Sequence, residues 1–500
     1  MPTLKTALRQ GRFACILEFV PKPSAARFDA LASMMGRREL CGWPMTVSIG
    51  DRVGSRLDLS PLEAHASLAH PVPTLLHFSG KDRERQDLLA QLERMDAAGL
   101  DQLLVLTGDR LQGHEPGAHP VRYLESVAAL AIIRRARPDW LLGAALNPFK
   151  YHEEEGGAQY FKAAKKLRAS ADFLDLQLGF DMAKHVEAWQ WMQGQPTPKP
   201  LIACLIAVTH GRAKMLQHVA GVTVSASMLR MLEAETEVSK AFAQRRSLRR
   251  LALQITQLQR IGYAGVHLSG VHELEQITAL EAAIQACQAE IDDQAQWQAA
   301  WDEAWHMPGV APVDFRPERA HWALGQAQVE PSFKEATRVR LLSALHHQVF
   351  GGTTPLSRAF AWLVRRPLWR SARGGRWLHR LERAAKRPLV GCDTCGRCRL
   401  EQTLYVCPET CPKGLANGPC GGTRLNRCEF GDRECIHSVR YRTAKADRVA
   451  ALASEALIDC VEVESRHRSS WPGWFGATQH TVEPEAAQPE NMNRLEHEVR

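Results

Sequence analysis

The feature that most constrains the fold is an alternation between short apolar runs and longer amphipathic segments over the first three hundred residues. The runs have the length and continuity of strands that are buried on both faces of a sheet. Eight of them are present: Phe13–Val20, Met45–Ile49, Thr74–Ser79, Gln102–Leu106, Leu141–Leu146, Phe173–Leu178, Leu201–Val208 and Gly265–Leu268. The segments between them have helical character, as in Asp87–Ala98, Glu125–Arg137, Ala158–Ala169 and Arg245–Arg260. Eight such repeats predict a (β/α)8 TIM barrel of class α/β. The alternative is a doubly wound open sheet, but no GxGxxG sequence follows the first run.

Polar residues recur where these runs end. The stretch Leu103–Asp109 (LLVLTGD) is the clearest case, because its apolar run stops at a glycine that permits a sharp turn and leaves the Asp109 carboxylate at the strand end. The other polar residues at run ends are Glu18, Ser48, Asp51, His77, Asn147, Gln177 and His267. The carboxyl ends of all barrel strands meet on one face, where the active sites of such barrels are built. We therefore predict one shared site at that face.

Cysteine usage indicates the cellular compartment. Thirteen cysteines are present, and eight of them lie between residues 392 and 435. The chain begins without the apolar core of a signal peptide and has no apolar stretch long enough to span a membrane. This clustering favours metal binding in a reducing cytoplasm over a secreted disulfide framework. We therefore expect a cytoplasmic protein with no transmembrane span.

The clustered cysteines have the spacing of metal ligands. They are Cys392, Cys395, Cys398, Cys407, Cys411, Cys420, Cys428 and Cys435, enough for two sites of four thiolates. Zinc and iron–sulfur clusters both accept four cysteines. The CxxCxxC triplet and the two Cys-Pro pairs favour [4Fe–4S], whereas zinc sites more often consist of two separated CxxC pairs. We expect iron–sulfur here, with zinc as the alternative.

A basic segment precedes the cysteines. Between Arg358 and Arg387 there are nine arginines, one lysine and one acid, Glu382, together with Trp362, Trp369 and Trp377. Such a segment can dock on a partner subunit or a neighbouring domain, or lie on an anionic membrane surface. No nucleic-acid motif accompanies it, so a nucleic-acid partner is not expected. The predicted domains are a barrel at 1–290, a helical extension and linker at 291–355, the basic segment at 356–390, a small cysteine-rich metal-binding domain at 391–445 and a mostly disordered tail at 446–500.

Several motifs of the barrel occur in the order and spacing of a known family. They are LEFVPKP, LLHFSGKDR, LLVLTGD, NPF, ASADFLDLQLGFD and AGVHLSG, over about residues 1–285. In these motifs the chain resembles the methylenetetrahydrofolate reductase barrel. The stretch GCDTCGRCRLEQTLYVCPETCPKGLANGPCGG likewise resembles the cysteine-rich C-terminal domain associated with some of these reductases, here over about residues 380–445. In acetogens a related domain is a separate subunit, whereas both parts are fused in this chain.

The resemblance implies a role for individual residues. It makes Glu18 the proton-donating carboxylate, Asp109 the carboxylate that faces pterin and flavin, and Gln177 the amide that reads the pterin edge. A pterin edge both donates and accepts hydrogen bonds, as an amide does. The resemblance assigns flavin contacts to His77, Gly108, Asn147 and Lys166. Thr107 and Gln159 depart from the arginine and the acid that many members carry near the flavin.

The implied activity is the interconversion of 5,10-methylenetetrahydrofolate and 5-methyltetrahydrofolate by flavin-mediated hydride transfer. The flavin is FAD or FMN, and the electron donor is NAD(P)H, ferredoxin or another redox partner. The alternative is a folate-binding or electron-transfer component of a larger complex that lacks its own reductase activity. Because Glu18, Asp109 and Gln177 are all present, the enzyme is favoured.

Overall fold

Two compact units make up the chain. The computed structural model describes residues 3–51, 59–68, 70–110, 123–317, 320–431, 433–445 and 456–476. Unit 1 comprises residues 1–336 and 411–460, and unit 2 comprises residues 337–410 and 461–500. The cysteine stretch is therefore divided between the units after Thr410. Of the predicted tail, residues 446–455 and 477–500 lie outside the described residues.

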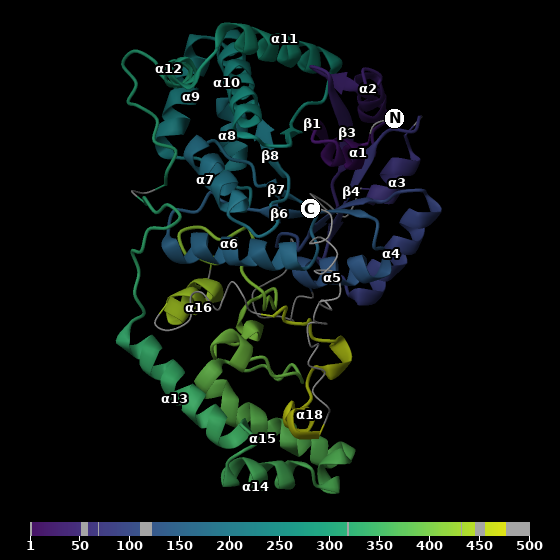
Figure 1. Cartoon of the computed structure of the whole chain (residues 1–500), viewed down its shortest axis with the longest axis vertical. Coiled ribbons are helices and arrows are strands. Elements are labelled where there is room, and N and C mark those ends of the chain that lie inside the picture. Colours follow the sequence, from purple (N-terminus) through teal and green to yellow (C-terminus); the bar gives the residue numbers. More distant parts are fainter. Residues whose placement is uncertain are drawn as a thin grey trace, which may run out of the picture. The chain divides into compact units, whose positions relative to one another are not determined.

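Unit 1 contains a closed parallel barrel (Figure 1). The strands run in the order β1-β9-β8-β7-β6-β5-β4-β3, and pairing of β1 with β3 closes the barrel. They are β1 (Ala14–Phe19), β3 (Trp43–Ile49), β4 (Thr74–Ser79), β5 (Gln102–Leu106), β6 (Leu141–Leu146), β7 (Phe173–Leu176), β8 (Leu201–Ile206) and β9 (Gly265–Ser269). The short β2 (Glu39–Leu40) pairs antiparallel with β3. All eight apolar runs are strands, so the TIM-barrel prediction is confirmed.

Helices follow the strands and cover the barrel. They are α1 (Leu4–Arg9), α2 (Ala25–Met35), α3 (Pro61–Ala66), α4 (Arg85–Ala97), α5 (Ser126–Ala136), α6 (Glu153–Arg168), α7 (Met182–Gln193), α8 (His210–Leu216), α9 (Ala226–Val238), α10 (Lys240–Ile261), α11 (Leu274–Glu290) and α12 (Gln294–Ala304). The inward-facing side chains of the strands form a core of their own, which Leu4 and Ala7 of α1 complete. A filled interior leaves the carboxyl ends of the strands as the face on which ligands can bind.

A further helix of unit 1 comes from the far end of the sequence. This is α16 (Ile436–Lys445), which packs beside α6 (Figure 1). Tyr441 of α16 stacks on Phe161 of α6, with ring centroids 5.7 Å apart. The polypeptide from Cys411 to Lys445 is therefore an integral part of the barrel unit.

Unit 2 is helical. Its elements are α13 (Phe333–Phe350), which begins at the end of unit 1, α14 (Pro355–Val364), α15 (Ala372–Val390), α18 (Trp471–Gly476) and the short 3-10 helices η1 (Pro367–Arg370), η2 (Glu401–Thr403), η3 (Pro408–Thr410) and η4 (Val463–Ser465). Val390, Leu400, Tyr405 and Cys407 form a small core. A second packed group consists of the aromatic side chains Phe350, Phe360, Trp471, Trp474 and Phe475. Within the described residues, no helix has the length and apolarity that crossing a bilayer requires.

Candidate functional site

Glu18 lies near the carboxyl end of β1, where the barrel face opens. Its neighbour in register on β3 is Ser48, and its side chain is partly exposed. Ser269, the last residue of β9, donates a hydrogen bond of 2.5 Å from Oγ to Glu18 Oε2. This bond fixes the orientation of the carboxyl group while leaving the side chain accessible. Ser269 was not singled out in the sequence, because a serine after a strand has no distinguishing local signal.

A buried polar layer lies next to Glu18. His77 Nε2 is 2.5 Å from Ser48 Oγ, and His267 Nδ1 is 2.7 Å from Asp175 Oδ2. The two imidazole rings meet edge to face, with centroids 6.1 Å apart. Burial, together with the nearby His267, lowers the pKa of His77 to about 3. Burial opposes a positive charge on His267 as well, but the Asp175 carboxylate outweighs it and raises the pKa of His267. One histidine is thus held neutral while the other favours its protonated form.

Asp109 follows β5, as predicted, and is held by a sharp turn. Gly108 has φ +88°, and a Cβ there would lie 2.2 Å from Ser79 Oγ, so only glycine fits. Asp109 itself is exposed in a concave, crowded part of the surface. These surroundings and the nearby Glu429 carboxylate raise the pKa of Asp109, with Lys413 and Lys81 opposing them. Asp109 is therefore closer to its neutral, proton-donating form than an ordinary aspartate.

Two residues from the cysteine stretch lie beside Asp109. Lys413 Nζ donates to the Gly108 carbonyl oxygen over 2.8 Å and pairs with Glu429 over 2.5 Å. Glu429 also accepts a hydrogen bond of 2.5 Å from the Arg110 backbone N–H. Reading the sequence did not identify Lys413 or Glu429. Each is about 300 residues from Asp109 along the chain, and no local pattern reports a contact of that separation.

Gln177 and Asn147 lie at the same face and are oriented by the backbone. Gln177 Nε2 donates to the Ala220 carbonyl oxygen over 3.2 Å, and its Oε1 accepts from Leu178 N over 2.9 Å. Asn147 Nδ2 donates to the carbonyl oxygens of Gly221 and Gly421, over 2.9 Å and 2.8 Å. An amide has two hydrogens and two lone-pair positions, so Gln177 keeps one of each for a ligand. Both hydrogens of the Asn147 amide are already used.

Lys166 is buried in α6 and bonds to the Ala145 carbonyl oxygen. Burial, together with the neighbouring Lys162, lowers the pKa of Lys166 to about 7. Gln159, three residues before Lys162 in α6, donates to the Cys420 carbonyl oxygen over 2.7 Å. His77 Nε2 and Lys166 each make a hydrogen bond within the chain, and both N–H hydrogens of Asn147 are engaged. A lysine ammonium carries three N–H donors, so the bond to Ala145 leaves Lys166 able to contact a phosphate.

The segment that follows Cys411 is held on the barrel by buried charges. Glu125, which precedes α5, pairs with Lys162 over 2.9 Å and accepts hydrogen bonds from the backbone N–H groups of Ala416 and Asn417. Burial opposes the charge of Glu125, but Lys162 and Asn417 outweigh it and lower its pKa to about 2. Lys162 also donates to the Gly418 carbonyl oxygen. These contacts fix the cysteine stretch at α5 and α6.

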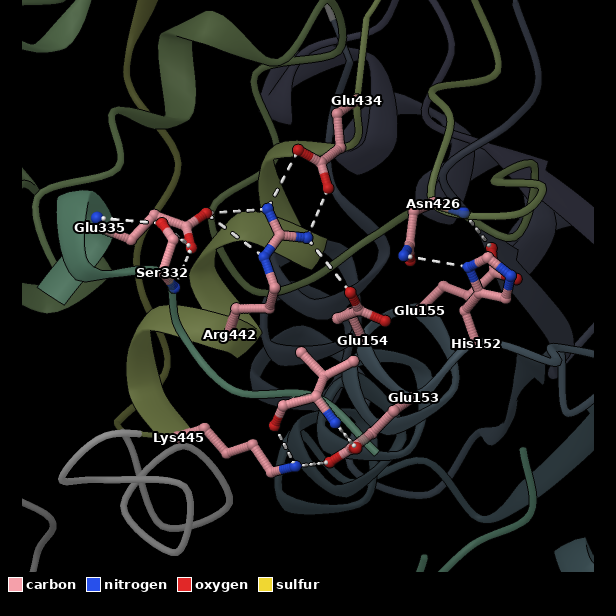
Figure 2. A network of polar contacts seen from close by, with 11 residues as sticks. His152, Glu153, Glu154, Glu155, Ser332, Glu335, Asn426, Glu434, Arg442 and Lys445 are labelled. Carbon is pink, nitrogen blue, oxygen red and sulfur yellow. Dashed lines mark hydrogen bonds and ion pairs between the residues drawn. The ribbon is translucent and has the colours of Figure 1, made fainter. Parts of the chain in front are cut away.

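A second set of charges joins α6 to α16 (Figure 2). Glu154 and Glu434 both accept hydrogen bonds from Arg442, which also pairs with Glu335 over 2.8 Å. Glu153 pairs with Lys445 over 2.6 Å. Glu155 accepts hydrogen bonds from the backbone N–H groups of residues 425 and 426. All three consecutive acids that begin α6 therefore contact this C-terminal segment.

The eight clustered thiols form two groups. In unit 2, Cys392, Cys395, Cys398 and Cys407 line one cavity. In unit 1, Cys411, Cys420, Cys428 and Cys435 lie close enough to influence one another electrostatically. Burial raises the pKa of Cys407 and of Cys411 to about 12. Among the described residues, no three or more side chains are already placed as ligands of a metal ion.

The donor set nevertheless matches a four-thiolate metal group in unit 2. Lys386 Nζ lies 3.5 Å from Cys398 Sγ, and the Thr394 backbone N–H points at Cys392 Sγ over 3.3 Å. Such N–H donors and a positive charge are what bound thiolates require. An apolar cavity lined by Phe350, Leu389, Tyr405 and Trp471 shares Lys386 and Cys398 with the thiol cavity.

Comparison of the sequence with known proteins gives two family matches. Residues 3–284 match the family described as "Methylenetetrahydrofolate reductase", and residues 374–463 match "Methylene-tetrahydrofolate reductase C terminal". No curated protein matches the chain. The first family covers the whole barrel, from α1 to α11.

Comparison with solved structures gives matches of low identity. A protein from Clostridium thermocellum that binds two copies of 5-methyl-5,6,7,8-tetrahydrofolic acid is 11% identical, covers 58% of this chain and 99% of its own, and gives a TM-score of 0.39. A 2,3-dimethylmalate lyase is 13% identical, with coverages of 59% and 90% and a TM-score of 0.33. An oxaloacetate acetylhydrolase is 13% identical, with coverages of 59% and 86% and a TM-score of 0.31. By its family match over more than half of its length, the chain belongs to the methylenetetrahydrofolate reductase family and carries that family's C-terminal domain in the same polypeptide.

Proposed function

We propose that this protein interconverts 5,10-methylenetetrahydrofolate and 5-methyltetrahydrofolate at the carboxyl face of the barrel. The observation that carries the proposal is the accessible Glu18 carboxyl group, oriented by Ser269 at the open end of a barrel of this family. Reduction adds a proton to N10 and a hydride to the methylene carbon. A positioned carboxylic acid is suited to supply that proton.

Glu18 acts at the step that opens the five-membered ring of the folate. Protonation of N10 breaks the bond between N10 and the methylene carbon and leaves an iminium at N5, which accepts the hydride. Ser269 holds Glu18 in one orientation through the hydrogen bond to Oε2. In the oxidative direction, hydride leaves the methyl group, N10 attacks the iminium carbon, and Glu18 takes back the proton.

Asp109 and Gln177 are proposed to bind the pterin. Gln177 has one N–H and one lone-pair position left for the pterin edge, and its backbone contacts hold it in place. Burial and the Glu429 carboxylate raise the pKa of Asp109, so this carboxyl group takes up a proton, and with it a hydrogen to donate, at a higher pH than an ordinary aspartate does. These roles rest on the family resemblance and on the location of both residues at the same barrel face.

The hydride source is a reduced donor of the nicotinamide class or a redox protein. The flavin that the resemblance implies would pass this hydride to the folate, with His77, Gly108, Asn147 and Lys166 as the residues that would hold it. The eight cysteines would hold two four-thiolate metal groups. If these are iron–sulfur clusters they supply one-electron transfer, and if they are zinc sites they supply only structural support.

The test is Glu18→Gln, which keeps the size and hydrogen-bonding capacity of the side chain but removes the acid. We expect turnover of methylenetetrahydrofolate to fall by about 10²-fold or more, the scale of general acid catalysis, with folate affinity retained. Turnover is measured without oxygen, with NADH, NADPH or reduced methyl viologen as donor. The matched control is Glu237→Gln, the same change at an exposed residue of α9.

Two outcomes count against the proposal. Near-normal turnover of Glu18→Gln at neutral pH would exclude Glu18 as the acid. The unmodified protein could also bind folate but show no turnover with any of the three donors. That result would support the second candidate function, a folate-binding component of a larger complex.

A further inference from the structure

Helix α15 carries two parallel stripes on its outward side. Trp377, Leu381, Ala384 and Pro388 recur at the spacing of one helix face. Arg376, Arg380, Arg383 and Arg387 each come one residue earlier and form a second stripe along the first. The opposite side of α15 packs into unit 2 through Leu378, Glu382 and Val390. The apolar stripe is therefore left outside the core of unit 2, with Trp377 60% exposed and Leu381 51% exposed.

The preceding elements continue this pattern. Trp362 at the end of α14 is 62% exposed, and Leu368 in η1 is 65% exposed. The structure fixes η1 against α15, because the Leu368 carbonyl oxygen lies 2.0 Å from where a Cβ on Gly374 would be. Only glycine permits that approach. The exposed leucine of η1 is thus held at the first turn of α15 by a specific backbone contact.

Arginine side chains lie directly on the exposed indoles. The Arg366 guanidinium lies 3.8 Å from the ring centroid of Trp362, and that of Arg380 lies 5.7 Å from Trp377. Such pairs give a surface that is apolar and positively charged at the same points. Tryptophan and arginine side chains are amphipathic and therefore suit the boundary between water and lipid. There the indole ring can enter the apolar region of the bilayer while the guanidinium stays among the headgroups.

The charge of this surface is of one sign. The segment 358–387 has nine arginines and a single acid, Glu382. Glu382 is 1% exposed and pairs with Lys386 over 2.6 Å, so it does not offset the arginines at the surface. No carboxylate of this segment therefore faces outward. The surface complements a negatively charged partner that also accepts apolar side chains.

We propose that unit 2 binds the surface of an anionic phospholipid membrane through this face, defined as the outward sides of α14, η1 and α15. A bilayer with anionic headgroups can bind both stripes at once. Trp377 and Leu381 would insert among the acyl chains, and the arginines would pair with the headgroup phosphates. A nucleic acid would satisfy the arginines but leave the exposed leucines in water. The face lies along the membrane surface and requires no spanning helix.

The experiment is flotation of the full-length protein with vesicles of phosphatidylcholine alone or mixed with phosphatidylglycerol. We expect binding to the mixed vesicles only, and weaker binding as salt screens the arginines. The variant Arg373→Gln/Arg376→Gln/Arg380→Gln/Arg387→Gln should bind about tenfold more weakly or worse, since each basic residue near an anionic surface contributes. The control Arg94→Gln/Arg135→Gln/Arg230→Gln/Arg245→Gln makes the same charge change at exposed positions of unit 1 and should bind normally.

The apolar stripe is tested separately. Trp377→Ser/Leu381→Ser should also weaken binding about tenfold, whereas Met215→Ser/Val238→Ser, which alters exposed apolar residues of unit 1, should not. A measurement on the unmodified protein avoids any folding defect of the variants: brominated lipids in the mixed vesicles should quench its tryptophan fluorescence.

Three results would overturn the proposal. They are equal binding to both kinds of vesicle, no quenching by brominated lipids, and equal binding of the two arginine variants. A dimer in solution that Trp377→Ser/Leu381→Ser converts to monomer, with no vesicle binding, would assign the face to a second copy of the chain instead.

Discussion

The two halves of the cysteine stretch differ in what holds them. The second half, from Cys411 to Cys435, belongs to the barrel unit. Glu125 and Lys162 bond to the backbone of residues 416–418, Lys413 bonds to the Gly108 carbonyl oxygen, and Arg442, just after this half, pairs with Glu154 of α6. The first half, from Cys392 to Cys407, belongs to the helical unit. Within that unit Arg399 pairs with Glu409, and Lys386 of α15, itself paired with Glu382, lies 3.5 Å from Cys398 Sγ. A region that matches one family domain therefore contains parts of two compact units.

The difference indicates which part of the molecule each half influences. A buried ion pair costs desolvation and is strongly destabilising when one partner is removed. Loss of contacts in the second half should therefore disturb the barrel and its candidate site, since Lys413 and Glu429 lie beside Asp109. Loss of contacts in the first half should disturb only unit 2.

The largest effect is expected for Glu125→Ala. Removing this carboxylate leaves the Lys162 ammonium buried without its ion pair and leaves the N–H groups of Ala416 and Asn417 without an acceptor. We expect unit 1 to lose about 3–5 kcal/mol of unfolding free energy, the scale of a broken buried pair. The measurement is urea denaturation combined with hydrogen exchange of peptides from β5 to β7.

The counterpart in the first half is Glu409→Ala, which removes the partner of Arg399 and Arg466. Faster hydrogen exchange should then be confined to residues 392–410, with β5 to β7 unchanged. If Glu409→Ala opened the barrel strands as much as Glu125→Ala does, the two halves would not be energetically separate.

An intermediate effect is expected for Gly157→Ala at the contact between α6 and α16. A Cβ at this position would lie 2.3 Å from the Tyr441 ring, which cannot simply move aside because its hydroxyl donates to Glu153 over 3.1 Å. Overpacking of this kind costs about 1–3 kcal/mol. Gly211→Ala in α8 is the matched control, since nothing lies within 4 Å of its Cβ, and it should be neutral or stabilising by about 0.5–1 kcal/mol. Thermal denaturation of both variants checks the prediction, and equal shifts would show that α16 is not packed closely on α6.

A pH-dependent effect is expected from Lys166, which lies in α6 beside Lys162. Its folded pKa is about 7, below the value of about 10.4 for an unfolded chain. Between these values the unfolded chain binds more protons, so stability rises with pH. We therefore compare the unfolding free energy of the unmodified protein with that of Lys166→Met. The difference should increase between about pH 7 and pH 9, by at most about 1.4 kcal/mol per pH unit.

Urea denaturation across that pH range measures the difference. A constant difference would mean that Lys166 stays charged, as it would beside a bound phosphate. That outcome would favour the flavin-contact role that the resemblance implies for Lys166.

The sequence alone determined the barrel and most of the positions of its strands. Thr74–Ser79, Gln102–Leu106 and Leu141–Leu146 were predicted with the boundaries that the structure has. This was possible because a strand buried on both faces must be continuously apolar, and that pattern is local. The position of Glu18, Asp109 and Gln177 at strand ends followed from the same pattern, because parallel strands place their carboxyl ends on one face.

Only the tertiary structure decided how the cysteines are grouped and which partners the polar residues have. Cys407 and Cys411 are four residues apart and lie in different units, which their spacing could not indicate. Lys166, for which the resemblance implies a flavin contact, bonds to Ala145, and Lys413 and Glu429 reach Asp109 from about 300 residues away. Ion pairs and hydrogen bonds between distant segments depend on how the chain returns to its own barrel, and no local periodicity encodes that path.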